Sequence, residues 1–425
     1  MRGKRALVRI VLVALALAVG SAVGSAVGQG QPATFTGASG PVPREYWGLH
    51  IHRAGALGSW PAAFGAWRLW DARVAWPNLE PNPGQWRFDA LDEYVEMARE
   101  HRVEILLPLG MSPSWASARP SEVSSYSPGA TAEPADLARW REYVRSVAQR
   151  YKGRVRHYEI WNEPNLKQFY TGSTAAMVDL AREAFQTLKA VDTDIVVVSP
   201  AATERGGIVW LDEYLRRGGA QYADVIGYHF YVAPMEPEAM VPMIRDVQQM
   251  LRRYGVNKPV WNTESGWMIP SHQKAVSPRG GTGIYSRVLN EDDAAAFVAR
   301  ACVLNWASGV ERLYWYAWDN FLMGLVEPDG RTVKPAGRAY QSVQDWMTGA
   351  QVRECQTGPS TLWSCQVTRA AGNDAWIVWS PNARSEFTAP PAWRVHRVRT
   401  LAGETRVLAA GERVALGAMP VLLER

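Results

Sequence analysis

The chain has 425 residues, more than one average domain, and its 47% hydrophobic and 20% charged residues are ordinary for a globular protein. Four of its 46 basic residues and none of its 41 acidic residues lie in the first 30 positions, so the rest of the chain is nearly neutral. A neutral chain lacks the basic surface that binds nucleic acid or anionic membranes, and neither is an expected partner.

Residues 1–30 have the layout of an export signal. A basic start, Arg2 to Arg5, precedes the apolar run Ile10–Val19, and small residues follow. This order is typical of a signal peptide, which predicts a secreted or periplasmic protein. The alternative is an uncleaved anchor in the inner membrane, although the apolar run Ala6–Val19, broken only by Arg9, is short for a span of about 20 residues.

Residues 31–43 are rich in Pro, Gly, Ser and Thr and are interpreted as a linker. Over residues 44–349, β-rich runs alternate with helical stretches, which indicates βα units around a parallel sheet. Eight such runs favour a closed (β/α)₈ TIM barrel over an open sheet. The expected strands are Trp47–His52, Ala66–Asp71, Glu104–Leu109, Val155–Asn162, Asp194–Ser199, Val225–Phe230, Pro259–Glu264 and Leu313–Trp318. The expected helices include Leu91–His101, Ala135–Tyr151, Thr174–Val191, Pro237–Tyr254 and Asp292–Ala307.

Two long connections, Gly110–Pro134 and Ser265–Glu291, follow the third and seventh expected strands. Loops of more than about 15 residues are usually functional, and the loops after barrel strands surround the active site. From residue 350 to residue 425 short strands alternate with turns, which predicts a small all-β domain of sandwich type. Its expected strands are Leu362–Thr368, Ala375–Trp379, Trp393–Thr400 and Glu404–Leu408.

The three cysteines have different expected roles. Cys355 and Cys365 flank a turn-like segment, and export would place them in an oxidising compartment, so we predict a disulfide between them. Cys302 lies in an apolar helical pattern and is expected to be a buried thiol. The cysteine spacing does not resemble that of a metal site.

Two motifs carry the expected chemistry. Residues 160–165, Ile-Trp-Asn-Glu-Pro-Asn, close the fourth expected strand and place Glu163 at the catalytic rim. Residues 259–267, Pro-Val-Trp-Asn-Thr-Glu-Ser-Gly-Trp, place Glu264 at the end of the seventh. Strands four and seven face each other across an eight-stranded barrel, so both carboxylates can converge on one sugar. A retaining glycoside hydrolase needs such a pair about 5–5.5 Å apart, one as nucleophile and one as acid and then base.

Residues 158–165, Tyr-Glu-Ile-Trp-Asn-Glu-Pro-Asn, together with Glu264, resemble the retaining glycosidases that have (β/α)₈ barrels. The pattern is most similar to glycoside hydrolase family 39 and related bacterial exopolysaccharide endoglycosidases. The resemblance covers roughly residues 44–425, since those relatives also carry a small β domain. It implies hydrolysis of O-glycosidic bonds, β-linked by default, in a polysaccharide or oligosaccharide. Glu163 is then the acid/base and Glu264 the nucleophile. A cofactor or metal is not expected, and we expect a monomer.

The resemblance also assigns substrate-binding residues. Asn162 would hydrogen-bond the sugar 2-OH, and Arg68 would support the nucleophile. The sixth expected strand would contribute a histidine and a tyrosine, and the eighth a tryptophan platform. The matching positions are His229 and Tyr231 for the sixth strand, Trp315 or Trp318 for the eighth, and His52, or second His50, for the first.

The two glutamates need different environments. A nucleophilic carboxylate must stay ionised, so we expect Arg68 and Tyr231 to depress the pKa of Glu264. The acid must hold a proton near neutral pH, so Glu163 needs apolar walls, such as Trp161, and the nearby charge of Glu264.

Several alternatives stay open from sequence. Purely structural roles are the alternative for the two glutamates, His229 and Tyr231. A carbohydrate-binding barrel without turnover is a separate alternative, although both glutamates are present, and a transglycosylase would use the same residues. Core packing competes with sugar stacking for Trp315 and Trp318. Trp70 and Trp115 are weaker candidates for outer subsites, and Glu159 is expected to form a buried hydrogen bond in the barrel. Metal-dependent hydrolysis is disfavoured because clustered ligands do not appear in the sequence beyond His50 and His52.

Overall fold

The structure is a computed structural model that describes residues 34–35, 37–57, 60–61, 63–278, 283–358, 362–369, 372–381 and 384–425. The expected leader lies outside the described residues. Within the described ranges, none of the helices combines the length and apolar character that a membrane crossing requires.

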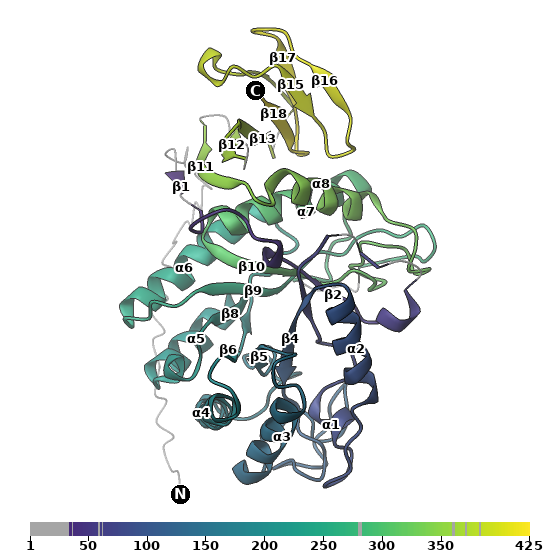
Figure 1. The fold of residues 1–425 in the computed structure, drawn as a ribbon, viewed down its shortest axis with the longest axis vertical. Helices are drawn as coiled ribbons and strands as arrows, with labels where there is room; N and C mark the ends of the chain where they lie inside the picture. The colour runs from purple at the N-terminus through teal and green to yellow at the C-terminus, as the bar shows by residue number, and fades with distance from the viewer. Residues whose placement is uncertain are drawn as a thin grey trace, which may run out of the picture. The chain divides into compact units, whose positions relative to one another are not determined.

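The first part of the chain forms a parallel sheet with helices around it, as Figure 1 shows. Its strands lie in the order β6-β5-β4-β3-β2-β10-β9-β8-β7. A parallel bridge between Val198 and Val225 joins the end of β6 to the residue before β8, and a second joins Asn162 to Ala201. These bridges connect the two edges of the sheet, so the predicted TIM barrel is confirmed. The strands are β2 Trp47–His50, β3 Ala66–Arg68, β4 Glu104–Leu109, β5 His157–Ile160, β6 Val196–Val198, β7 Ala202–Thr203, β8 Ile226–His229, β9 Val260–Ser265 and β10 Val310–Trp315.

Each of the eight expected strands is present, but most are shorter at their carboxyl ends. Backbone pairing within the sheet stops where the chain enters the loops around the site: β3 ends at Arg68 and β5 at Ile160. The short strand β7 was not expected, because two residues carry no periodic signal. Residues that the sequence pattern placed inside strands, such as Asp71 and Asn162, therefore lie in the loops that surround the active site.

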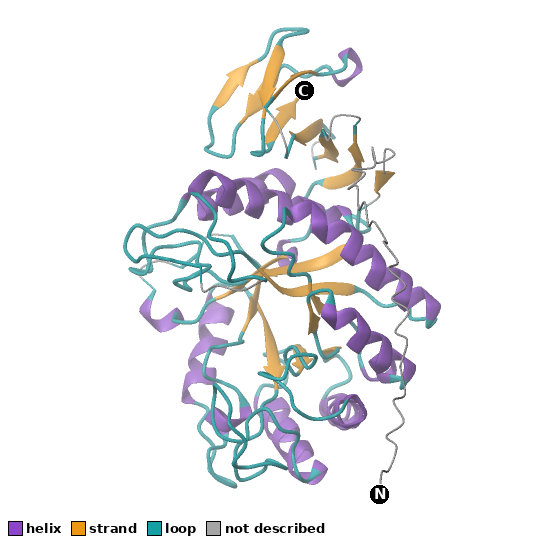
Figure 2. Ribbon diagram, turned by 180° about the vertical axis from the view of Figure 1, so that it is seen from behind, coloured by secondary structure: helices purple, strands orange, loops and turns teal. Residues whose placement is uncertain are grey.

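Helices cover the outside of the barrel, and Figure 2 shows them around the strands. The five expected helices are present within a few residues, and α5 and α8 add to the ring. Side chains cap three of them at the N-terminus: Asp136 accepts from Ala138 N, Ser173 from Ala176 N and Asn290 from Asp293 N. The helices are α1 Trp76–Leu79, α2 Asp89–Glu100, α3 Leu137–Arg150, α4 Thr174–Val191, α5 Gly206–Arg216, α6 Met240–Arg253, α7 Glu291–Ala307 and α8 Pro335–Met347.

The carboxyl-terminal part is an antiparallel sheet of seven strands in the order β1-β11-β12-β13-β18-β15-β16, accompanied by the pair β14-β17. Along β13, Ala375, Ile377 and Trp379 join the core shared with the barrel, whereas Trp376 and Val378 join a separate cluster with the β14-β17 pair. The expected all-β domain is confirmed. Its strands are β11 Gln351–Thr357, β12 Trp363–Thr368, β13 Asp374–Trp379, β14 Ser385–Thr388, β15 Arg397–Arg399, β16 Thr405–Val407, β17 Arg413–Leu416 and β18 Val421–Glu424.

One strand of this sheet comes from the segment interpreted as a linker. Strand β1, Thr34–Phe35, pairs antiparallel with β11 next to residues Cys355 and Gln356. The sequence interpretation of residues 31–43 as a linker is therefore wrong for these two positions. Pairing with a strand more than 300 residues away has no local signature in a Pro- and Gly-rich segment.

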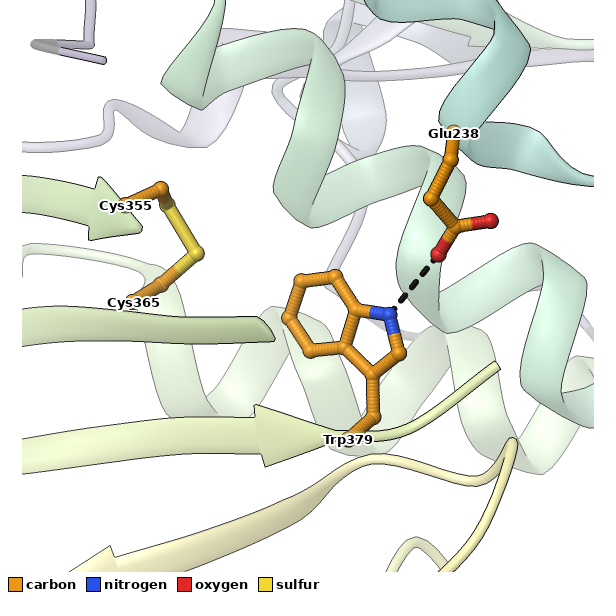
Figure 3. The surroundings of a disulfide bond; sticks show 4 residues. All are labelled: Glu238, Cys355, Cys365 and Trp379. Carbon is orange, nitrogen blue, oxygen red and sulfur yellow. Dashed lines mark hydrogen bonds between the residues drawn. A yellow bond between two sulfur atoms is a disulfide. The ribbon is translucent and has the colours of Figure 1, made fainter. Parts of the chain in front are cut away.

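Cys355 and Cys365 form a disulfide between β11 and β12, where they are direct cross-strand neighbours (Figure 3). Cys302 is a buried free thiol on α7. Near the disulfide, Trp379 Nε1 donates to Glu238 Oε1 across 2.7 Å, which joins β13 to the barrel segment before α6.

Candidate active site

Glu163 lies just after β5, where the backbone turns sharply. Trp161 and Glu163 adopt φ angles of 61° and 42°, which non-glycine residues rarely do. Glu163 N donates to Ala201 O across 2.9 Å, which holds this turn against the residues before β7. Glu163 is 6% exposed, and its Oε1 lies 2.9 Å from His229 Nδ1. Such strain commonly marks a functional position, and here it aims a carboxyl into the mouth of the barrel.

Glu264 lies on β9, on the opposite side of the barrel from Glu163. Arg68 Nη1 donates to its Oε2 across 2.8 Å, and the Tyr231 hydroxyl donates to its Oε1 across 3.0 Å. One oxygen of each glutamate and one ring nitrogen of His229 lie within 4.8 Å of one another. The two carboxylates thus face the same small space, close enough to act on one bond.

Arg68, at the end of β3, hydrogen-bonds three side chains of the site. Its Nε donates to Glu159 Oε2 across 2.5 Å and its Nη2 to Asn162 Oδ1 across 2.7 Å, in addition to the bond to Glu264. The other Glu159 oxygen accepts from Thr263 Oγ1 across 2.7 Å. The predicted buried hydrogen bond of Glu159 is therefore confirmed.

Burial dominates the ionisation of both glutamates. It raises the pKa of Glu163 to about 7, because a charge inside the barrel loses its hydration. Burial also raises the pKa of Glu264 to about 7, and the charge of Glu163 adds to the rise. The expectation of a depressed pKa for Glu264 is therefore wrong. Arg68 does favour the ionised form of Glu264, but it shares its charge with Glu159.

The hydrogen-bond donors decide which carboxyl holds the proton of the pair. Two close carboxyls titrate together and share one proton over a range of pH. Glu264 receives hydrogen bonds from a guanidinium and a phenol, both of which favour a carboxylate. Glu163 lies 2.9 Å from His229, which is neutral because burial lowers its pKa to about 4. Burial raises the pKa of Glu163 by more than the nearby Thr203 hydroxyl and the charge of Arg68 lower it. The donors therefore favour a proton on Glu163 and a negative charge on Glu264.

His50 ends the first barrel strand and lies inside the barrel, whereas His52 follows the strand. His50 is fully buried, its Nε2 lies 3.2 Å from Thr263 O, and its pKa is lowered by burial and then by Arg68. His52, which the sequence ranked first, is half-buried, and its ring lies 5.0 Å from that of Tyr316. Both rings border the site, with His50 closer to the residues that hold Glu264.

The two tryptophans proposed as a platform are both buried. Trp315 is 0% exposed and stacks on Trp267, and Trp318 is 2% exposed. Neither presents an open face, so a sugar-stacking role for either stays a prediction. Tyr316, between them in sequence, is half-buried and contacts both His50 and His52.

Several buried polar atoms near the carboxylates lack a partner in the described part of the chain. Leaving such atoms without a hydrogen bond costs about 1–3 kcal/mol each. A ligand rich in hydroxyl groups can satisfy them. The atoms are Asn162 Nδ2, His50 Nδ1, His52 Nε2 and His229 Nε2.

A cavity of about 290 Å³ lies beside β3 and is bordered by the loop after β4. Asp71 lines it and accepts hydrogen bonds from Tyr126, across 3.1 Å, and from Tyr316, across 2.7 Å. Trp70 and Met111 add apolar surface. Sequence reasoning missed Asp71 and both tyrosines, because the three come from loops that only the fold brings together.

Glu163, His229 and Glu264 are also spaced like the ligands of a cation, with one atom each within 4.8 Å. Sequence spacing could not reveal this group, since its members come from three different strands. Arg68 already supplies positive charge to Glu264, so the grouping is equally suited to an acid-and-nucleophile pair. The expected absence of a metal stays an expectation.

Comparison with known proteins relates part of this chain to a family. Residues 80–273, which contain both glutamates, match the family model described as Glycosyl hydrolases family 39. Over these residues the chain is similar to glycoside hydrolase family 39, as the sequence resemblance predicted. Glycosidase activity stays a proposal.

Sequence similarity to a curated relative is limited to part of the chain. A β-xylosidase from Caldicellulosiruptor saccharolyticus is 27% identical over 152 residues, which are 34% of this chain and 31% of that protein. The match thus spans about a third of the relative's length.

Solved structures share the fold over most of the chain. A family 39 glycoside hydrolase from Bacteroides cellulosilyticus WH2 has a TM-score of 0.70 at 18% identity, covering 90% of this chain and 81% of that one. A monomeric β-xylosidase from Caulobacter crescentus CB15 has a TM-score of 0.61 at 16% identity, covering 91% and 97%. At these identities the likeness extends to the architecture only.

Proposed function

We propose that this chain is a retaining glycosidase with Glu264 as nucleophile and Glu163 as acid/base. The observation that supports this most directly is the carboxyl pair, with one oxygen of each within 4.8 Å of the other. Retaining pairs are about 5–5.5 Å apart, whereas inverting pairs are about 6.5–9.5 Å apart to admit a water. The unequal donors on the two carboxyls support the assignment of roles.

In the proposed reaction, Glu264 attacks the anomeric carbon while Glu163 gives its proton to the departing glycosidic oxygen. This forms a covalent glycosyl-enzyme ester, and Glu163 becomes a carboxylate. Glu163 then takes a proton from a water molecule, the water displaces Glu264, and the configuration at the anomeric carbon is retained. Asn162, whose Nδ2 has no partner in the described structure, would donate to the sugar 2-OH.

We further propose a β-linked oligosaccharide or polysaccharide as substrate, with a bacterial exopolysaccharide as one candidate. Two of the similar proteins are described as β-xylosidases, which favours β linkage. The cavity beside Asp71, about 290 Å³, is at the small end of ligand sites and suits one neighbouring sugar unit. The Caulobacter relative is described as monomeric, and we propose the same for this chain.

The two roles make opposite demands on alanine variants. Glu264→Ala should abolish turnover of 2,4-dinitrophenyl β-glycosides, because no covalent intermediate can form, and azide should rescue it with inverted configuration. Glu163→Ala should still form the intermediate, since that leaving group needs little acid help. Azide should then rescue its breakdown with retained configuration. The measurement is proton NMR of the glycosyl azides from a panel of xylosides, glucosides and galactosides.

The controls are wild-type protein and Glu386→Gln, a substitution at an exposed position of β14, and the two should behave alike. The same azide anomer from both alanine variants would contradict the assignment, as would inverted product from wild type. Release of longer transfer products at high sugar concentration would favour the transglycosylase alternative. Binding of polysaccharide without turnover on the whole panel would favour a binding barrel.

A further inference from the structure

Glu159 is a third carboxylate of the site, placed where substrate cannot reach it. Its side chain is 0% exposed, and it lies on β5 below Glu163. Both of its oxygens are engaged, one by Arg68 Nε across 2.5 Å and one by Thr263 Oγ1 across 2.7 Å. Any effect on the reaction must therefore pass through these neighbours.

Arg68 is the neighbour that reaches the reacting groups. Its guanidinium is also 0% exposed, with Nη1 on Glu264 and Nη2 on Asn162. A guanidinium is planar and its donors are fixed relative to one another, so a bond at Nε sets the directions of Nη1 and Nη2. Holding Nε with a carboxylate thus aligns the nucleophile and the sugar-binding amide together.

The negative charge of Glu159 also acts on Arg68. Among the charges around Arg68, Glu159 interacts with it most strongly and Glu264 comes next. Without Glu159, the full charge of Arg68 would favour ionised Glu264 and make it a weaker base and nucleophile. The other titratable groups around Glu264 come from several elements. They are His229 and Tyr231 from β8 and its end, Glu163 after β5, Asp71 after β3, Tyr126 from the loop after β4 and Tyr316 after β10.

We propose that Glu159 is a positioning residue for the displacement at Glu264, which it serves by orienting Arg68 and cancelling part of its charge. The inference rests on the proposed function. It assigns to one buried carboxylate the alignment of both Glu264 and Asn162.

Two substitutions separate charge from position. Glu159→Gln keeps the shape and removes the charge, so the acid limb of the kcat/KM profile should move about one unit to lower pH as Glu264 ionises more easily. Glu159→Asp keeps the charge and withdraws the carboxylate by one methylene. The acid limb should then stay in place while kcat falls roughly 100-fold through misalignment. The substrate is the aryl β-glycoside that wild type turns over fastest.

Glu80→Gln is the matched control, because Glu80 is also buried and hydrogen-bonded, to Trp76 Nε1 and Gly84 N, outside the carboxyl pair. Its pH profile should equal that of wild type. A Glu159→Gln profile that stays in place or moves to higher pH would overturn the proposal, as would wild-type kcat in Glu159→Asp. If Glu159→Gln does not fold, the Glu159→Asp result alone decides in the same way.

A substrate-free measurement distinguishes failure of this inference from failure of the proposed function. Carbon-13 NMR titration of protein labelled at the glutamate carboxyls, with Glu264→Gln to assign the signal, gives the pKa of Glu264 directly. That pKa should be lower in Glu159→Gln than in wild type. A lower pKa without turnover on any glycoside would sink the glycosidase proposal and leave the Arg68–Glu159 coupling standing. An unchanged pKa would reject the coupling itself.

Discussion

Among the individual residues, the two glutamates of the site are buried, and their burial makes the charged form unfavourable. Glu163 and Glu264 are 6% and 7% exposed, and each has its pKa raised to about 7 chiefly by burial. A carboxyl that titrates near 7 can serve as an acid at neutral pH, which a solvated glutamate cannot do. The same burial must weaken the folded state whenever the group is ionised.

Because the ionised carboxylate weakens the folded state, we expect Glu163→Gln to increase the free energy of unfolding by an amount that depends on pH. The folded pKa is raised above the unfolded value, so the folded state binds more protons between pH 4.5 and pH 7, and stability falls as pH rises through this window. Removing the titrating group should therefore stabilise the protein more at pH 8 than at pH 5, by on the order of 2 kcal/mol. Urea unfolding at both pH values measures the difference. Glu386→Gln should give no such trend, and an equal gain at both pH values would contradict the burial argument.

At the element scale, α7 is the helix most completely enclosed by its neighbours. Its residues from Ala294 to Ala307 are buried, which fits a helix without a polar stripe. Arg300 is the buried cation on this helix, with a side chain 0% exposed. It donates to Glu238 across 3.1 Å and to Glu236 across 2.5 Å. Glu238 in turn accepts from Trp379, so one ion pair links α7, the segment before α6 and the carboxyl-terminal sheet.

Arg300→Ala should therefore be strongly destabilising. The change leaves Glu238 without its cation and opens a cavity against α7, and breaking a buried pair costs about 3–5 kcal/mol. Equilibrium unfolding in urea is the measurement. Arg141→Ala is the matched control, since Arg141 pairs with Glu183 while 40% exposed, and an exposed pair contributes less than about 1 kcal/mol. Equal decreases in the free energy of unfolding for the two variants would show that the buried pair stabilises the fold no more than the exposed pair.

At the scale of the whole molecule, the barrel and the carboxyl-terminal sheet share a hydrophobic core. Trp363, Cys355, Cys365 and Trp379 from the sheet belong to the same buried cluster as the barrel helices. Helix α7 packs on both β10 and β11. Parts that share a core should unfold together, because exposing one face exposes the other.

Replacing both Cys355 and Cys365 with serine tests this coupling. The disulfide spans 10 residues, and closing so short a loop stabilises a fold by about 2–3 kcal/mol. Calorimetry of the variant should give a single transition at lower temperature, with the barrel and the sheet moving together. Cys302→Ser, which changes the free thiol on α7, separates thiol loss from disulfide loss. Two separate transitions, of which only one is displaced, would refute a shared core.

Elements with a local signal could be predicted from the amino-acid sequence. Eight β-rich runs with intervening helices predicted the barrel, since alternation and helical period depend on neighbouring residues. Glu163 and Glu264 could be named because each lies in a short motif at a strand end, and Glu159 because period two places it on the same face, deeper in the barrel. The expected leader stays a prediction.

The pairing and ionisation of those residues depend on their three-dimensional surroundings. Strand β1 pairs with β11 across more than 300 residues, and Asp71 meets Tyr126 and Tyr316 from separate loops. The raised pKa of Glu264 also depended on the fold. The sequence identified Arg68 as the cation beside Glu264. The loss of hydration at Glu264 and the ion pair of Arg68 with Glu159 depend on burial and distance in three dimensions. Burial and distance depend on residues that are far apart in the sequence, so a local sequence pattern does not reveal them.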